Sequence, residues 1–148
     1  MTGGAYIDTS ALAKYYLTES HSEAVESYLQ STSLAPAISR LTRVEFVCLL
    51  RRRRRTGQIT AAFERSVRAN FERQVARSLF RLVPLTDADF DLSIALIDRV
   101  GVALRSLDAL HLAAATTCEA EEFVTADGVQ AAAARKLGFS VAFFGQVA

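Results

Sequence analysis

The apolar residues of this chain follow two patterns, short continuous runs and longer stretches with helical spacing. Short apolar runs between polar residues are typical of buried strands, whereas apolar residues three or four positions apart form one face of a helix. Phe63, Val67 and Phe71, for example, have the helical spacing. The short runs predict strands at Ala5–Asp8, Leu34–Ser39, Phe80–Leu85, Glu122–Thr125 and Ser140–Phe144.

The helical spacing fills most of the intervals between these runs. Residues that suit helix ends set the boundaries: Thr56-Gly57 ends one helix, and Asp87 opens another, where a carboxylate suits the positive end of the helix dipole. Strands and helices alternate without a linker or repeat, which favours one α/β domain, residues 1–148, with a mainly parallel sheet. The predicted helices are Ser10–Thr18, His21–Gln30, Thr42–Arg55, Thr60–Leu79, Asp87–Val100, Ser106–Glu119 and Gly128–Leu137.

The composition is that of an ordinary globular protein, with 51% hydrophobic and 22% charged residues. No apolar run approaches the ~20 residues of a membrane span, and the N-terminus lacks the features of a signal peptide. We therefore expect a cytoplasmic protein that does not enter a membrane. Cys48 and Cys118 lie among apolar neighbours, and we expect reduced core thiols in preference to a disulfide.

The net charge of +1 hides a strong asymmetry along the chain. Residues 40–81 contain twelve arginines and three glutamates, a local charge of +9, and the remainder has five basic and thirteen acidic residues, a charge of −8. The basic part includes five consecutive arginines, Arg51–Arg55. Such a region is typical either of a surface for a polyanion or of a solvated helix with internal ion pairs. Charge alone does not decide between them.

Four carboxylates lie where apolar stretches end or helices begin: Asp8, Glu45, Asp108 and Asp127. In a parallel sheet, the carboxyl ends of the strands meet at one edge, so acids that are distant in sequence can converge there. Ionised carboxylates repel one another unless a cation lies among them, and oxygen ligands suit hard divalent cations. The spacing therefore predicts a metal site.

Each acid also has a purely structural interpretation. Glu45 could form a capping box with Thr42, and Asp108 could lie in the first turn of a helix capped by Ser106. Asp127 could cap the helix that begins at Gly128, and Asp8 could cap the helix that follows it. Taken singly, the structural interpretation is favoured for every acid except Asp8, which follows a buried strand where a lone charge is expensive.

Other chemistries find little support in the sequence. The chain has neither the glycine-rich loop of nucleotide-binding folds nor the Gly-x-Ser-x-Gly motif of serine hydrolases. Its two histidines and two cysteines are too dispersed for a zinc motif. His111 follows Asp108 by about one helical turn and is flanked by leucines, which favours a packing or supporting role over that of a catalytic base.

The acids and their neighbours also occur in a familiar order. The segments are Tyr-Ile-Asp8-Thr-Ser-Ala-Leu, Ser39-x-x-Thr42-x-x-Glu45, Leu-Arg-Ser-Leu-Asp108-Ala-Leu-His and Val-Thr125-Ala-Asp127. In this order and spacing they resemble the PIN domain, and most closely the VapC-type toxins of prokaryotic toxin–antitoxin systems. The resemblance spans nearly the whole chain, and four motifs in order are more specific than any one of them.

The resemblance implies a three-layer α/β/α sandwich with a five-stranded, mainly parallel sheet, and an endoribonuclease that depends on Mg²⁺ or Mn²⁺. Asp8, Glu45 and Asp108 match the three acids of the family's metal site. Asp127 matches the more variable fourth acid. No side-chain nucleophile is then needed, because such a cation acidifies water for attack on the phosphate. The residues expected beside these acids are Thr9 and Thr125.

The same resemblance implies an RNA substrate, a small antitoxin protein as partner, and a homodimer. We expect the antitoxin to lie in a groove lined by the helices at Ser10–Gln30 and Arg40–Arg55. The family pattern does not require the run Arg51–Arg55, and five consecutive residues cannot share one helical face. The candidate RNA contacts in the basic region are Arg43, Arg51, Arg52 and Arg55.

Two other functions also fit the residues. One is a protein that binds nucleic acid or a partner without catalysis, with the acids as helix caps and the arginines as the binding surface. The other is a PIN-type nuclease that acts on DNA or on structured RNA. Cleavage of matched RNA and DNA substrates, with and without a divalent cation, distinguishes the three.

Overall fold

A computed structural model of the protein describes residues 3–146 and contains, in that range, five strands and seven helices. Every element has the type that the hydrophobic pattern predicts. The strands are β1 (Ala5–Ile7), β2 (Ala37–Ser39), β3 (Arg81–Val83), β4 (Glu122–Thr125) and β5 (Ser140–Phe143). The helices are α1 (Thr9–Tyr16), α2 (Ser22–Ser31), α3 (Arg40–Arg55), α4 (Ala61–Ala76), α5 (Asp87–Val100), α6 (Ser106–Thr117) and α7 (Gly128–Lys136).

The strands form one sheet in the order β3-β2-β1-β4-β5, and every neighbouring pair is parallel. The central strand β1 pairs with β4 through Ile7 and Val124, so the segments that follow these two strands leave the sheet side by side. The chain winds outward in both directions from β1, which makes the carboxyl end of this strand the switch point where α/β proteins place their sites.

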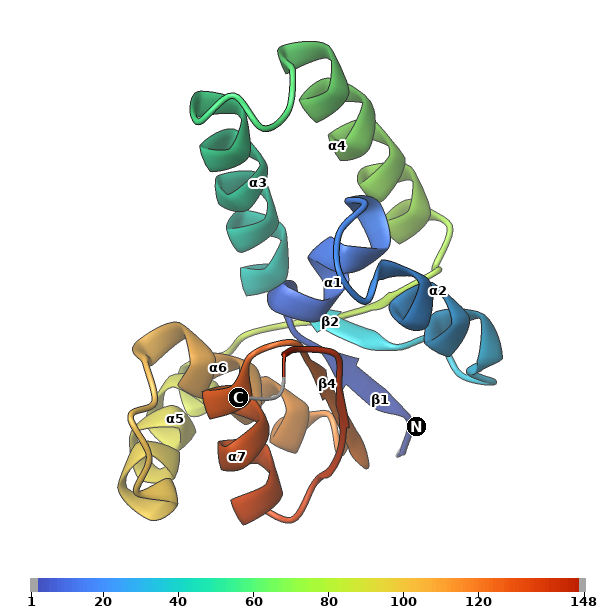
Figure 1. The fold of residues 1–148 in the computed structure, drawn as a ribbon. Coiled ribbons are helices and arrows are strands. Elements are labelled where there is room, and N and C mark those ends of the chain that lie inside the picture. Colours follow the sequence, from blue (N-terminus) through green and yellow to red (C-terminus); the bar gives the residue numbers. More distant parts are fainter. Residues whose placement is uncertain (1–2, 147–148) are drawn as a thin grey trace.

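Alternate residues of the strands face opposite sides of the sheet, and each side has its own core. Ile7, Ile38 and Val124 pack with residues of α1, α3 and α4, whereas Tyr6 and Phe123 pack with residues of α5, α6 and α7. Figure 1 shows the helices in these two groups on either side of the sheet. The predicted α/β/α sandwich with a five-stranded parallel sheet is therefore confirmed.

Most predicted boundaries differ from the observed ones by a few residues, and two of the differences have a clear local cause. The strand expected at Leu34–Ser39 is shorter because Pro36, which has no amide hydrogen for the sheet, precedes β2. The helix expected from Thr42 begins at Arg40, since Ser39 is its N-cap and the Ser39 amide donates to Thr42 Oγ1 at 3.2 Å. Thr42 therefore belongs to a capping box with Ser39, and the predicted box with Glu45 is wrong.

Helices α3 and α4 form a pair that extends away from the sheet (Figure 1). Ion pairs connect the two helices: Arg51 to Glu64 at 2.9 Å, and Arg43 to Glu72 at 2.8 Å. The Glu64 side chain is only 3% exposed. A second arginine, Arg54, lies 3.6 Å from the same carboxylate. Part of the arginine-rich segment therefore stabilises this helical pair, as the internal ion-pair interpretation predicts.

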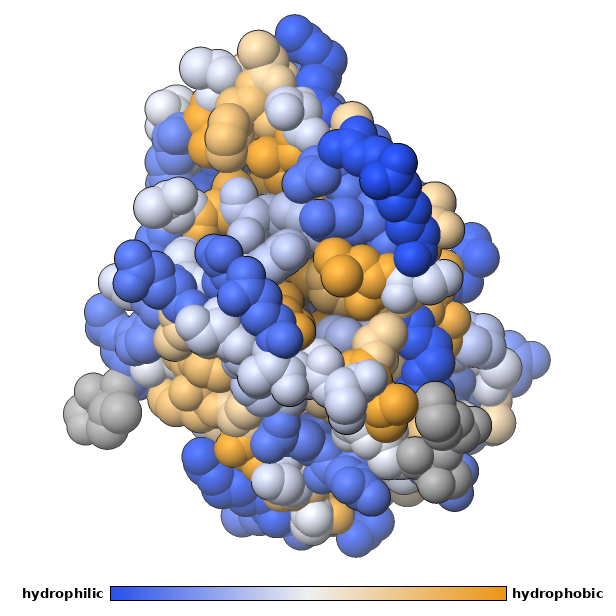
Figure 2. All heavy atoms as spheres, turned by 90° about the vertical axis from the view of Figure 1, so that its right-hand side faces the viewer, coloured by the Kyte–Doolittle hydropathy of each residue, from blue (hydrophilic) through white to orange (hydrophobic). Residues whose placement is uncertain are grey.

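The surface gives two further outcomes. On the face of α2 and α4, hydrophilic side chains separate the apolar residues into small patches (Figure 2). Within residues 3–146, no helix is both long and apolar enough to cross a membrane. Both cysteines are free, as predicted, and half-buried Cys118 packs against the core, but Cys48 is exposed, so its assignment to the core is wrong.

Candidate functional site

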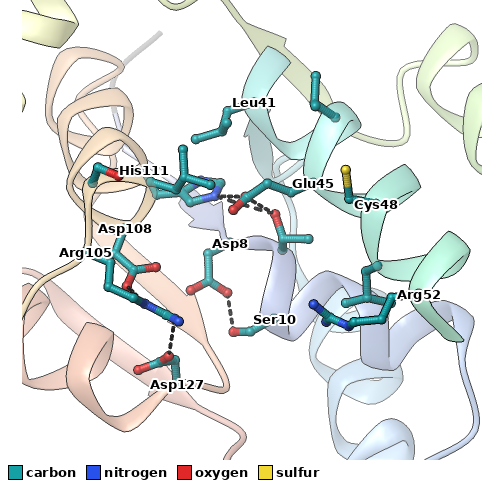
Figure 3. A pocket seen from close by; sticks show the side chains of 15 residues that line it. Asp8, Ser10, Leu41, Glu45, Cys48, Arg52, Arg105, Asp108, His111 and Asp127 are labelled. Atoms are coloured by element: carbon teal, nitrogen blue, oxygen red, sulfur yellow. Dashed lines mark hydrogen bonds and ion pairs between the residues drawn. The ribbon is translucent and has the colours of Figure 1, made fainter. Parts of the chain in front are cut away.

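All four predicted carboxylates line one cavity of about 590 Å³ at the carboxyl ends of β1 and β4 (Figure 3). Asp8 directly follows β1, and Asp127 lies two residues after β4. Asp108 is in the first turn of α6, and Glu45 lies in the second turn of α3. The fold thus brings together residues that are as much as 119 positions apart in the sequence.

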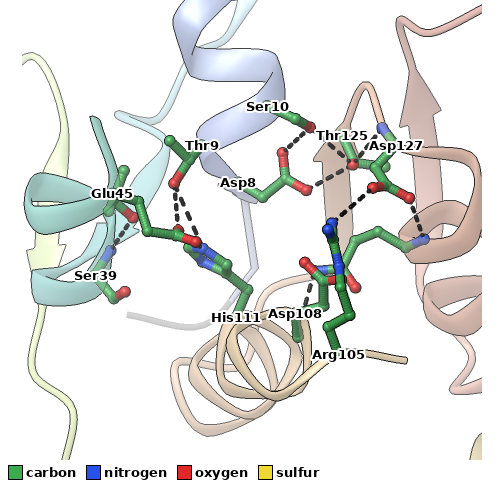
Figure 4. Close-up of polar contacts among 12 residues, drawn as sticks. Asp8, Thr9, Ser10, Ser39, Glu45, Arg105, Asp108, His111, Thr125 and Asp127 are labelled. Atoms are coloured by element: carbon green, nitrogen blue, oxygen red, sulfur yellow. Dashed lines mark hydrogen bonds and ion pairs between the residues drawn. The ribbon is translucent and has the colours of Figure 1, made fainter. Parts of the chain in front are cut away.

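Asp8 is the most deeply buried of the four, with 4% of its surface exposed. It is the N-cap of α1, and Oδ1 accepts hydrogen bonds from the Ala11 amide at 3.2 Å and from the Ser10 hydroxyl at 2.6 Å. Oδ2 accepts from the Thr125 hydroxyl at 2.6 Å (Figure 4). Burial raises the pKa of Asp8, although His111 and these hydrogen bonds oppose the increase. No ion pair in residues 3–146 includes this carboxylate.

Glu45 is held by one of its oxygens. Oε1 accepts from the Thr9 hydroxyl at 2.6 Å and pairs with Nε2 of His111. Burial raises the pKa of Glu45, but the hydrogen bonds and charge of its partners, first among them His111, outweigh burial and lower the pKa overall. Oε2 makes no hydrogen bond or ion pair to the residues that the structure describes, so it is available to a ligand.

Arg105 connects the other two carboxylates. Its Nε lies 3.2 Å from Oδ2 of Asp108, and its NH2 group lies 3.5 Å from Oδ2 of Asp127 (Figure 3). Asp127 also caps α7, because its Oδ1 accepts from the Gln130 amide at 3.0 Å. The N-cap of α6 is Arg105 rather than Ser106, so that expectation is wrong. The arginine side chain is 77% exposed, so its ion pairs with the two acids face solvent.

The structure adds Ser10 and Arg105, which the sequence did not predict, to the site, and it gives the expected supporting residue His111 a specific partner. Ser10 bonds to Asp8 and accepts from the Ala126 amide at 2.9 Å, which connects α1 to the end of β4. Arg105 provides the cation between two acids, and His111 contacts Glu45 directly. His111 is 2% exposed, in agreement with a supporting role. Ser10 could have been inferred from its position two residues after Asp8, because hydroxyls at that spacing favour caps.

The profile of the PIN domain family matches residues 5–142 of the chain. The chain belongs to the PIN-domain family. A curated relative, Ribonuclease VapC47 of Mycobacterium tuberculosis (strain CDC 1551 / Oshkosh), is 34% identical over an alignment of 148 positions that covers 96% of this chain and 98% of the relative. The family predicted from four short motifs is therefore confirmed.

Two solved structures have the same fold as this PIN domain. VapC20 of Mycobacterium tuberculosis, described as a Sarcin-Ricin loop cleaving toxin, superimposes with a TM-score of 0.70 at 16% identity, over 88% of this chain and 95% of that one. A toxin–antitoxin complex from Klebsiella pneumoniae superimposes with a TM-score of 0.65 at 19% identity, over 97% of this chain and 100% of that one. At these identities, the likeness establishes the fold.

The acids of this PIN domain are not preassembled as a metal cage. Within residues 3–146, no three His, Cys, Asp or Glu side chains are close enough together to hold an ion. Arg105 and His111 instead pair with three of the four carboxylates. The donor set nevertheless fits a hard divalent cation: it consists of carboxylate oxygens, and buried Asp8 has no counter-ion of its own.

The predicted RNA contacts of the PIN domain fall into two groups. Arg43 and Arg51 are paired with Glu72 and Glu64, so their binding to a polyanion would compete with these ion pairs. Arg52 lines the cavity about two helical turns after Glu45, on the same face of α3, and Arg55 is exposed at the end of this helix. No ion pair within residues 3–146 includes either of them. Contact with RNA stays a prediction for all four arginines.

Proposed function

We propose that this PIN domain is a metal-dependent endoribonuclease, the toxin component of a VapBC-type toxin–antitoxin system. The observation that carries the proposal is the convergence of Asp8, Glu45, Asp108 and Asp127 on one cavity, at the switch point of a parallel sheet. The 34% identity with a protein named as a ribonuclease supports RNA as the substrate class. The reaction would be hydrolysis of a phosphodiester bond.

The carboxylates would hold Mg²⁺ or Mn²⁺ through oxygens that the protein leaves available. A carboxylate offers about four acceptor sites, and Asp8 uses three of them for hydrogen bonds. Glu45 retains Oε2, and Asp108 retains Oδ1 even while Arg105 is bound. Bound here, the cation supplies a Lewis acid that acidifies water and offsets the negative charge of the phosphate.

The protein's own part is to orient these ligands and to attract the substrate. Thr125 of β4 and Ser10 of α1 both donate hydrogen bonds to the Asp8 carboxylate and hold it in place. Less side-chain conformational entropy is then lost when a cation binds. Arg52 at the cavity wall is suited to an RNA phosphate. Contacts of this kind make affinity fall with increasing salt and depend little on sequence.

The proposed antitoxin site is an apolar surface on α3. Leu41, Val44 and Cys48 line both the carboxylate cavity and an adjoining one that reaches Val47 and Leu85. An apolar segment of an antitoxin that lies there would cover the acids. Helix α3 and the start of α1 thus line the proposed groove, but α2, which was expected to contribute, lines a separate cavity through Leu29 and Gln30.

We also propose a homodimer through α5. Phe90, Ile94 and Ile97 form an exposed apolar stripe with helical spacing, and Ile94 is 64% exposed.

A glutamate at position 94 would place a charge in a contact between two copies, so Ile94→Glu is expected to raise the dimer dissociation constant at least about tenfold. Sedimentation velocity measures it. Ala95→Glu, exposed but off the stripe, is the control, and an unchanged dimer in Ile94→Glu contradicts the α5 contact.

Removal of Arg105 should strengthen metal binding. A cation that also uses Oδ2 of Asp108 or Asp127 competes with this arginine, and an exposed ion pair contributes up to about 1 kcal/mol. Arg105→Ala is therefore expected to bind Mn²⁺ about two- to fivefold more tightly, as measured by electron paramagnetic resonance of free Mn²⁺. Arg99→Ala, an exposed arginine of α5, is the control. Unchanged or weaker binding by Arg105→Ala would show that the arginine does not compete.

The function is tested most simply in cells. Expression of the wild-type protein is expected to arrest growth and to degrade RNA, and Asp108→Asn is expected to relieve the arrest at equal protein level. Asp98→Asn, which neutralises an exposed acid of α5, should remain as toxic as the wild type. Arrest by Asp108→Asn at full strength would contradict the proposed role of the carboxylates.

A further inference from the structure

A chain of hydrogen bonds runs behind the carboxylate cavity. The Tyr6 hydroxyl donates to Ser39 Oγ at 3.0 Å and lies 2.7 Å from Nδ1 of His111. The other ring nitrogen, Nε2, pairs with Oε1 of Glu45. Tyr6 and Ser39 are fully buried and His111 is 2% exposed. Tyr6, Ser39 and His111 belong to β1, β2 and α6. The hydrogen bonds therefore connect the sheet to α6 and, through Glu45, to α3.

The two nitrogens of His111 have different partners, which fixes the ring. An ionised carboxylate can only accept hydrogen bonds, so the contact with Glu45 requires a proton on Nε2. The opposite edge of the ring is held by Tyr6, whose own ring stacks on Phe123 at a centroid distance of 5.7 Å. The imidazole therefore cannot rotate without breaking buried contacts on both sides.

The consequence for Glu45 is positional. A free glutamate side chain loses several rotatable bonds when it binds a ligand, and that loss opposes binding. Here Thr9 and His111 both hold Oε1, whereas Oε2 has no partner among the described residues. One oxygen is anchored and the other is left for a ligand, which is how supporting residues orient the ligands of a metal.

We propose that His111, braced by Tyr6, is a positioning residue that orients Glu45 for the divalent cation. The proposal rests on the proposed metal-dependent function. It assigns His111 no contact with substrate or cation. It also explains why a polar ring lies within the apolar stretch Leu110 to Leu112, where packing alone would favour another leucine.

Two substitutions of nearly equal chemistry separate positioning from packing. In His111→Gln, the amide nitrogen can occupy the place of Nε2 and still donate to Glu45. In His111→Asn, the shorter side chain places its amide near Nδ1, so the bond to Glu45 is lost. Mn²⁺ affinity, measured by electron paramagnetic resonance, is expected to fall about tenfold in His111→Asn and clearly less in His111→Gln, which keeps the bond to Glu45 but loses the contact with Tyr6.

Repeating the pair in a Glu45→Gln background completes the test. If His111 acts through Glu45, the difference between the two substitutions disappears in that background. Tyr6→Phe, which keeps the aromatic stacking, is expected to show a smaller loss with the same sign. Thermal melts in EDTA verify that each variant is folded.

The outcomes distinguish the two proposals. Suppose that the wild-type protein binds Mn²⁺. The positioning role alone would then be overturned if His111→Gln and His111→Asn have equal affinities for Mn²⁺, or if their difference persists in the Glu45→Gln background. Failure of the wild-type protein to bind Mn²⁺ would overturn the proposed metal-dependent function, and the positioning role with it. If His111→Asn does not fold, Tyr6→Phe and His111→Gln carry the test, and wild-type affinity in Tyr6→Phe contradicts the bracing by Tyr6.

Discussion

Asp8→Asn is expected to reduce Mg²⁺-dependent RNA cleavage about a thousandfold, which corresponds to roughly 4 kcal/mol of transition-state stabilisation. Asn preserves the shape of the side chain and its acceptor oxygen, so the α1 cap and the contacts with Ser10 and Ala11 can persist. The substitution removes the charge that would attract the cation, and it exchanges the acceptor Oδ2 for an amide nitrogen that can donate to the Thr125 hydroxyl instead of accepting from it. Single-turnover cleavage of a labelled RNA measures the effect, and cleavage at the wild-type rate would contradict the metal site.

The same substitution should stabilise the metal-free protein. Burial raises the pKa of Asp8 above its unfolded value, so ionisation opposes folding. The stability from the protonated acid is complete below the ordinary pKa of Asp, about 3.9, and is lost as pH rises through the raised folded pKa. Each unit of increase corresponds to about 1.4 kcal/mol. In EDTA at neutral pH, Asp8→Asn is therefore expected to resist urea better than the wild type.

The pH dependence and the metal provide the controls for that measurement. The advantage of Asp8→Asn should shrink as pH falls toward the ordinary pKa of Asp. Mg²⁺ should stabilise the wild-type protein and have little effect on Asp8→Asn, because a ligand that binds only the folded state stabilises it. Asp98→Asn, on the surface of α5, should behave as wild type throughout. A lower stability of Asp8→Asn in EDTA at neutral pH would contradict the buried, uncompensated charge.

Phe46→Ala is expected to lower the free energy of unfolding by about 3–5 kcal/mol. Phe46 is fully buried, and its ring lies 5.3 Å from that of Tyr16 and 5.0 Å from that of Phe71. These three aromatic residues join α3 to α1 and α4. Glu45 directly precedes Phe46 in α3. The cavity left by alanine would loosen the packing of α3, which holds Glu45 at the site. Urea denaturation at constant metal concentration measures the loss.

The matched control is Phe63→Ala on α4. Phe63 is 43% exposed whereas Phe46 is fully buried, so truncation of Phe63 removes less buried surface and should cost only about 1–2 kcal/mol. A loss of similar size for Phe46→Ala and Phe63→Ala would show that the aromatic cluster does not anchor α3. The Phe46 variant should also bind Mn²⁺ more weakly under conditions where it is folded.

Periodicity predicted the fold because the strands and helices of this chain differ clearly in hydrophobic spacing. The meeting of Asp8 with Asp127 also followed from the sequence, since the carboxyl ends of parallel strands share an edge. Capping and convergence proved compatible: Asp8 and Asp127 cap α1 and α7 while they line the cavity. The structural interpretation of these acids and the functional one were therefore not true alternatives.

The partners of the acids were harder to predict. Arg105 has a long exposed side chain, and although its spacing suits a pair with Asp108, nothing indicates its contact with Asp127, which lies 22 residues further along the chain. His111 lies between two leucines, so its sequence context resembles core packing and conceals the bond to Glu45. Successive residues of α3 are rotated by about 100° around the helix axis, so apolar neighbours in the sequence do not show on which face Cys48 lies. The structure places it on the exposed face.

The central claim is that the carboxylate cavity cleaves RNA with the help of a divalent cation. The most direct measurement is single-turnover cleavage of a matched RNA and DNA pair by the purified protein, across a titration of Mg²⁺ and Mn²⁺ and in EDTA. The account predicts internal cleavage of the RNA that appears with the cation, stops in EDTA and leaves the DNA intact. Binding of RNA without cleavage at any cation concentration, or cleavage that persists in EDTA, would contradict it.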